Sequence, residues 1–175
     1  MRKTRNTMTT ESMTTDPTTT DNTTTPNATT GGTTVAMLIG LGLTVIATLV
    51  ALLDPQQTDL VGQHVREAYP QWDAGTVATE RTAIVGWLVG VGVLGIVGWL
   101  TSLWAVRRRS RRALWLAAAW FALAVLAAGL TLGTGGEAYD VIVPTPLGLL
   151  SALPLVAGVV VLMRMWRDRA ALAPA

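Results

Sequence analysis

Residues 83–132 read AIVGWLVGVGVLGIVGWLTSLWAVRRRSRRALWLAAAWFALAVLAAGLTL, and their hydropathy and charge pattern indicates the fold. Two apolar runs of about 20 residues, each long enough to cross a bilayer, lie on either side of a basic turn over residues 107–112. An arginine at the bilayer centre costs roughly 2.5–3.5 kcal/mol, so a turn with several of them stays on one side. Because Lys and Arg near span ends mark the cytoplasmic face, the stretch predicts a membrane hairpin held in the cytoplasm. The predicted anchor residues are Arg107, Arg108, Arg109, Arg111 and Arg112.

Tryptophans near the ends of these runs support the same arrangement. Trp99, Trp104 and Trp115 are close to the basic turn, and Trp87 is near the far end of its run. Indole rings prefer the two membrane interfaces, so this spacing is typical of aromatic belts. The basic turn also predicts attraction to anionic lipid, at about 1 kcal/mol per residue.

The composition indicates a membrane protein rather than a nucleic-acid-binding protein. Half of the 175 residues are hydrophobic and only 14% are charged, against about 25% charged residues in soluble domains. Eleven of the thirteen basic residues fall in segments predicted to be cytoplasmic, so the net charge of +2 is a topology signal. The absence of Cys excludes disulfides, thiol catalysis and Cys-ligated metals. The excess of Arg over Lys, twelve to one, favours a high-GC bacterial gene.

The whole chain predicts an all-α, polytopic membrane protein with a four-helix transmembrane bundle. We expect spans at residues 34–53, 82–106, 113–132 and 146–163, joined by outer loops at residues 54–81 and 133–145. The two outer loops hold two basic and seven acidic residues, whereas the tail, turn and C-terminus hold three, five and three basic residues. This asymmetry predicts a multi-pass protein of the cell membrane with both termini, including residues 164–175, in the cytoplasm.

The N-terminal segment has a different composition. Sixteen of the first 34 residues are Thr and almost none is apolar. Such a segment cannot bury enough surface to offset its ordering entropy, so we predict a disordered cytoplasmic tail over residues 1–33.

The second span is the predicted packing centre of the bundle. It contains two small-xxx-small pairs, Gly86 with Gly90 and Gly98 with Ser102. Small residues let membrane helices approach closely, which favours helix contact. The predicted helix-packing residues are Gly86, Gly90, Gly95, Gly98 and Ser102. In the fourth span we predict a kink at Pro154, with Ser151 bonding to the backbone that the proline frees.

The loop at residues 54–81 is too long for a minimal connection, and long connections are often functional. We expect Thr58 to cap a short helix that runs to about Tyr69 and is ended by Pro70. This helix would lie along the outer interface or on the end of the bundle, where it would dock a partner or cover the helices.

Candidate residues for chemistry are few. None of the four predicted spans holds an ionisable residue, which argues against proton-coupled transport. His64 is the only histidine, and Glu67 shares its helix face, a weak metal signal. A membrane enzyme would depend on His64, Asp73 or Glu80 in the outer loop. Ser110, within the basic turn, has the setting of a kinase site, where phosphate would oppose attraction to anionic lipid.

The leading functional interpretation is a non-enzymatic subunit or scaffold that acts through helix–helix and outer-loop contacts. Its partner would be a second copy or another membrane protein. The alternative is a carrier or binder of an apolar or lipid-like molecule, in a cavity formed by the kink at Pro154 and the small residues of the second and third spans. Neither hypothesis includes a catalytic residue, a metal or a cofactor.

Overall fold

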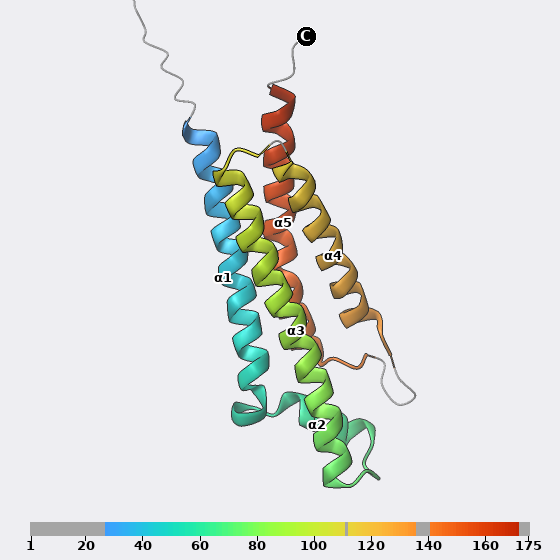
Figure 1. Cartoon of the computed structure of the whole chain (residues 1–175). Helices are drawn as coiled ribbons and strands as arrows, with labels where there is room; N and C mark the ends of the chain where they lie inside the picture. The colour runs from blue at the N-terminus through green and yellow to red at the C-terminus, as the bar shows by residue number, and fades with distance from the viewer. Residues whose placement is uncertain (1–26, 111, 136–140, 172–175) are drawn as a thin grey trace, which may run out of the picture.

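The computed structural model of the chain describes residues 27–110, 112–135 and 141–171. These residues form five helices and no strand (Figure 1): α1 (Asn27–Gln57), α2 (Leu60–Ala68), α3 (Ala74–Arg107), α4 (Ala113–Gly133) and α5 (Thr145–Ala171). Four of them, α1, α3, α4 and α5, are long and apolar enough to cross a membrane. The predicted all-α, four-span membrane fold is therefore confirmed. The tail before Asn27 and the anchor residue Arg111 lie outside the described residues.

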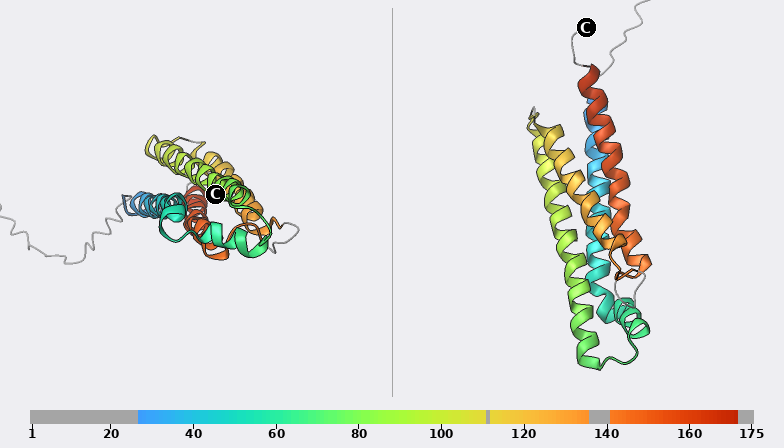
Figure 2. Two further views of the ribbon diagram at one scale, coloured as in Figure 1. Left: turned by 90° about the horizontal axis from the view of Figure 1, so that it is seen from below. Right: turned by 90° about the vertical axis from the view of Figure 1, so that its right-hand side faces the viewer.

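The four spanning helices form a ring. Helix α1 packs against α3 and α5, and α4 packs against the same two helices from the other side. The short helix α2 crosses the end of the bundle that is remote from the α3–α4 hairpin, and it packs against α1 and α3 (Figures 1 and 2). Val61 and Val65 of α2 are fully buried there, in a cluster with Ile84 of α3 and Leu147 of α5. Helix α2 thus closes one end of the ring.

Large side chains lying over glycines bring the spanning helices together. The ring of Trp99 lies so close to Gly40 that a Cβ atom added to the glycine would be 2.3 Å from the indole. In the absence of a hydrophobic force between helices in lipid, such close packing is a main source of helix association. The same arrangement recurs with Trp120 over Gly98, Phe121 over Gly158 and Leu132 over Gly148.

Three helices extend beyond the predicted spans. Helix α3 begins at Ala74 rather than at residue 82, because the Asp73 carboxylate caps it by accepting from the backbone N–H groups of Gly75 (2.7 Å) and Thr76 (3.0 Å). Helices α1 and α5 extend at the other end of the bundle, where the Arg164 side chain lies against Gly32. At 34 residues, α3 is about 51 Å long, well beyond the ~30 Å hydrocarbon core of a bilayer.

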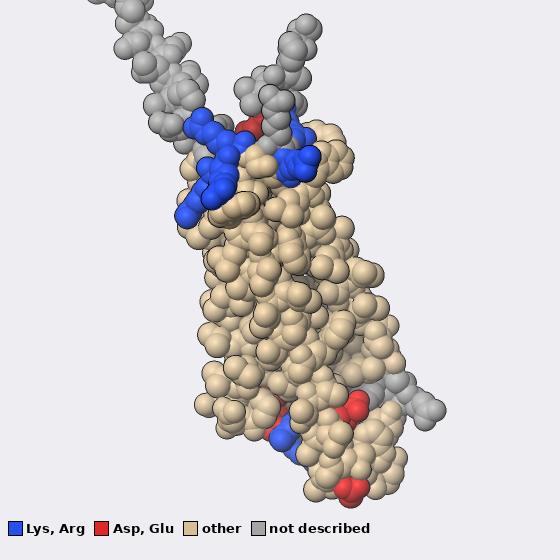
Figure 3. Space-filling view, viewed as in Figure 1, with Lys and Arg blue, Asp and Glu red and all other residues tan. Residues whose placement is uncertain are grey.

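Charged residues gather at the two ends of the bundle (Figure 3). Arginines surround the end that holds the α3–α4 hairpin and the C-terminal part of α5, whereas most of the described acidic residues lie at the end closed by α2. The surface between the two ends carries no charge in this view. This uncharged band is what contact with the hydrocarbon core requires.

The glycine contacts give a direct prediction for stability. We expect Gly40→Ala to lower the free energy of unfolding by roughly 1–3 kcal/mol, because the new methyl group would collide with the rigid ring of Trp99. Gly42→Ala on the same helix is the control, since a Cβ atom there meets nothing within 4 Å. Thermal unfolding in detergent, followed by circular dichroism, measures both. Equal stability of the two variants would contradict the packing argument.

Candidate functional site

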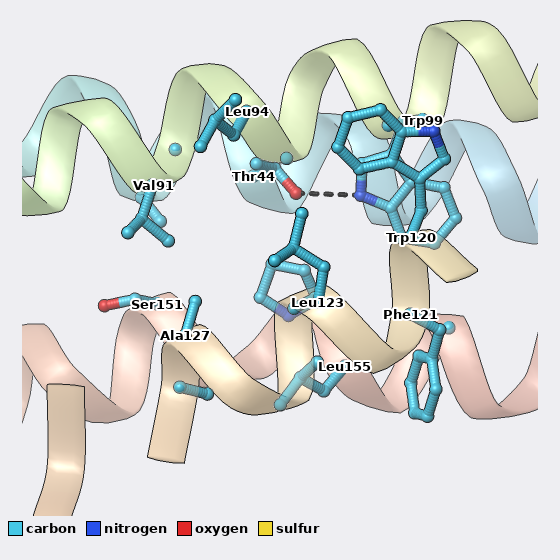
Figure 4. Close-up of a pocket in the computed structure, with 18 of the residues that line it drawn as sticks. Thr44, Val91, Leu94, Trp99, Trp120, Phe121, Leu123, Ala127, Ser151 and Leu155 are labelled. Carbon is cyan, nitrogen blue, oxygen red and sulfur yellow. Dashed lines mark hydrogen bonds between the residues drawn. The ribbon is translucent and has the colours of Figure 1, made fainter. Parts of the chain in front are cut away.

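The main candidate site is a cavity of about 570 Å³ between the four spanning helices. All four helices contribute to its wall, and none of the lining residues is charged. Figure 4 shows apolar side chains from α3, α4 and α5 around it, among them Leu94, Leu123 and Leu155. Small residues such as Gly90 and Ala127 leave its interior unfilled.

The cavity opens sideways between α3 and α4. Every lining residue that is also exposed belongs to one of these two helices, whereas the lining residues of α1 and α5 are buried or half-buried. The exposed lining residues are Gly86, Trp87, Gly90, Leu94, Leu123, Leu126 and Leu130. Helices α1 and α5 therefore form the back of the cavity, and the opening faces outward from the bundle.

The hydroxyl groups that line the cavity are mostly engaged within the chain. Thr44 donates to the Gly40 carbonyl (2.8 Å) and accepts from the indole N–H of Trp99 (3.0 Å), as Figure 4 shows for the second bond. Thr131 accepts in the same way from Trp87 (3.0 Å), which joins α4 to α3 at the edge of the opening. Because these hydrogen bonds occupy the polar atoms, the lining behaves as an apolar surface.

The structure separates the predicted helix-packing residues into two groups. Gly95 faces Thr44 of α1, Gly98 faces Trp120 of α4, and Ser102 is 4% exposed. Gly86 and Gly90 instead border the opening of the cavity, where an added Cβ atom would meet nothing within 4 Å. Within the chain, these two glycines make space rather than a helix contact.

Pro154 lies inside α5 and lines the cavity. The expected role of Ser151 is wrong, because its hydroxyl donates to the Leu147 carbonyl and not to the Leu150 carbonyl that the proline frees. A serine in a helix bonds most easily to the carbonyl four residues before it, and Leu147 is that residue.

The predicted cytoplasmic anchor begins at the C-terminal end of α3. Arg107 is in the last turn of the helix, and the Arg108 guanidinium lies 4.3 Å from the centre of the Trp104 ring. Such a cation–π contact holds a charge beside an interfacial tryptophan. Arg109 adopts a left-handed backbone conformation (φ 50°) after the helix ends, and Arg112 precedes α4.

A buried acid at the end of α1 fixes the start of α2. Asp54 is 2% exposed, and its carboxylate accepts from the backbone N–H groups of Leu60 (3.0 Å) and Val61 (3.1 Å). The expected cap, Thr58, is wrong: its hydroxyl donates to Asp54 (2.7 Å), and α2 begins after Asp59. The first N–H groups of a helix need acceptors, and here the preceding helix supplies them.

Two of the three residues considered for chemistry, His64 and Asp73, are engaged in other contacts. The Nε2 atom of His64 lies 2.9 Å from the Val141 carbonyl oxygen, which ties α2 to the segment before α5. Asp73 caps α3, and its hydrogen bonds from Thr76 and Gly75 hold the pKa of its carboxyl below the usual value. Within the described ranges, no three His, Asp or Glu side chains group together as metal ligands.

Asp59 links α2 to α3 outside the spans. Its carboxylate pairs with Arg66 (2.8 Å) and with Arg81 (3.1 Å). Partial burial raises the pKa of Asp59, but the hydrogen bonds and charges of the two arginines outweigh this effect and lower it below 3.8. The linked helices and the stacked rings of Tyr69 and Trp72, 4.0 Å apart, form a platform at this end of the bundle.

Comparison with known proteins provides no relative for this chain: no protein-family model, no curated protein and no solved structure matches it.

The Asp59 contacts predict a loss of stability in acid. Because the folded-state pKa is lowered, the ion pairs stabilise the fold above about pH 4 and are lost as the pH falls through that pKa. For partly exposed pairs we expect about 0.2–1 kcal/mol each. Asp59→Asn should be less stable than the native chain at pH 7 and should lose less stability between pH 5 and pH 3. Thermal unfolding across this range measures the difference, and parallel curves for both proteins would refute it.

Proposed function

We propose that this chain is a non-enzymatic, multi-pass membrane protein that binds one apolar small molecule between its spanning helices. The cavity carries the proposal. Its volume, about 570 Å³, lies within the range of about 300–1,000 Å³ that is usual for ligand pockets. Its lining is uncharged and mainly apolar, so it suits a ligand of the same character.

The size of the cavity argues for an occupant. Protein interiors are packed as closely as organic crystals, and large unfilled voids are rare. An engineered apolar cavity of only about 150 Å³ already binds benzene. No side chain of this protein fills the space beside Gly86 and Gly90. A bound molecule would restore the lost dispersion contacts.

A subunit or scaffold role is the second candidate, and the platform at the α2 end supports it. Because α3 is longer than the bilayer is thick, its first turns project beyond the hydrocarbon core together with α2. The stacked pair of Tyr69 and Trp72 lies there beside Arg66. Aromatic residues and arginine are enriched in protein interfaces, so a second membrane protein or another copy would dock at this end.

The proposed orientation places the arginine-rich end in the cytoplasm of the cell membrane. The hairpin and the end of α5 hold Arg107, Arg108, Arg109, Arg112 and three further arginines of α5. These charges would attract anionic lipid of the cytoplasmic leaflet, at about 1 kcal/mol per residue. The α2 platform then faces outward.

Native mass spectrometry of the protein released from its own membranes tests the binding proposal. We expect a discrete additional mass on the native chain, and a roughly tenfold weaker retention in Gly90→Leu, equal to ~1.4 kcal/mol, because the leucine would occupy the cavity. Gly129→Leu is the control, since Gly129 lies on α4 outside the cavity and has open space around it. A native chain without an added mass would contradict binding, and a stoichiometric second protein would favour the subunit role.

Cysteine labelling tests the orientation, because the chain has no native Cys. Single cysteines at the exposed residues Ser110 and Gln71 should react differently with a membrane-impermeant reagent on intact cells. We expect labelling at residue 71 only. Labelling at residue 110 only would show that the orientation is the opposite of the one proposed.

A further inference from the structure

The cavity is open along one half of the bundle and closed along the other. Its exposed lining residues lie in the half nearer to α2 and at the middle of the bundle, with Leu94 and Leu123 the ones furthest from α2. In the half nearer to the hairpin its lining includes Met37, Ser102 and Val161, which are 1%, 4% and 2% exposed. A ligand that enters from the lipid must therefore enter beside the α2-side leaflet and point toward the closed end.

The opening is too short for a membrane-spanning helix. At one end it is bounded by the hydrogen bond between Trp87 and Thr131 (3.0 Å), and at the other end Trp120 lies against Gly98. The twelve residues from Trp87 to Gly98 span about 16 Å along α3, whereas a helix that crosses the hydrocarbon core covers about 30 Å. Because contacts between α3 and α4 close both ends, a partner helix that spans the membrane cannot lie along the opening. The occupant must therefore be a smaller molecule.

The cavity is long compared with one leaflet. Its lining on α3 extends over seventeen residues, from Gly86 to Ser102, or about 24 Å. Half of the hydrocarbon core of a bilayer is about 15 Å thick. A thin occupant that fills the cavity therefore passes the bilayer midplane.

The lining provides no site for a charged group. It contains no charged residue, and three of its four hydroxyl groups, those of Thr44, Thr131 and Ser151, already donate to carbonyls of their own helices. A charged headgroup would lose its hydration here without meeting an opposite charge. Only the hydrocarbon part of an amphiphile fits, with its headgroup left at the interface beside α2.

We propose that the apolar ligand is one acyl chain of a membrane phospholipid, which enters sideways between α3 and α4 from the leaflet beside α2. This inference rests on the proposed function and specifies its ligand class. The acyl chain lies along the back wall formed by α1 and α5, between Leu155 and Gly90. Its headgroup remains outside the bundle.

Photo-crosslinking tests the proposal on the full chain in vesicles that contain phosphatidylcholine with a diazirine in its acyl chain. Two residues of α5 form an internal comparison: Leu155 lines the cavity, and Val156 next to it is 66% exposed on the outer face. We expect crosslinks at both. In Gly90→Leu the yield at Leu155 relative to Val156 should fall at least fivefold, whereas Gly129→Leu should leave the ratio unchanged.

A second cavity variant, Ala127→Leu, fills the space from α4 and should lower the same ratio. Circular dichroism shows whether each variant keeps its helices. Absence of crosslinks at Leu155, or a ratio that neither variant changes, would overturn the acyl-chain proposal. If native mass spectrometry still shows a bound mass that Gly90→Leu removes, the binding function stands and its ligand is a different apolar molecule. If the native protein carries no added mass and the crosslinking result is also negative, both the binding function and the acyl-chain ligand are wrong.

Discussion

The contact of a large side chain with a glycine controls the structure of this bundle. In lipid there is little hydrophobic force between helices, so close packing decides which surfaces meet. Where Trp99 lies over Gly40 and Phe121 over Gly158, the helices come together. Where Gly86 and Gly90 meet no such side chain, α3 and α4 leave a space between them. Glycines thus produce both the tight contacts and the cavity, depending on whether a large side chain lies opposite them.

Electrostatic contacts organise the two ends in different ways. At the α2 end, acids are matched to specific partners: Asp54 binds the first N–H groups of α2, and Asp59 joins Arg66 and Arg81. These contacts hold α2 across the ring and close it. At the hairpin end, arginines gather with a single described acid among them, which suits a surface against anionic lipid (Figure 3). The uncharged middle leaves the sideways opening as the route to the cavity.

Much of the fold could be predicted from the sequence, because long uncharged runs have few stable alternatives in a membrane. The third span ends within one residue of its prediction, at Gly133. The helix starts at Asn27 and Ala74 were missed, since caps and contacts rather than hydropathy extend these helices. The cap of α2 was assigned to Thr58, because a carboxylate from the preceding helix has no local sequence signal. The small-xxx-small spacing also predicts Gly86 to be a helix-packing residue. Whether a side chain of α4 covers this glycine depends on the position of α4, which the spacing does not give.

Spin-label accessibility at Ala127 tests whether the bundle has an apolar interior that is connected to the lipid. Ala127 lines the cavity, and Ala122 on the exposed face of the same helix provides the lipid reference. With a single cysteine label at each position in vesicles, we predict strong relaxation by oxygen, which partitions into hydrocarbon, and weak relaxation by a water-soluble nickel chelate at both. Strong relaxation by nickel at residue 127 would mean a water-filled interior, and no relaxation by either reagent would mean that the helices close the space. Either result would rule out an apolar cavity open to the lipid.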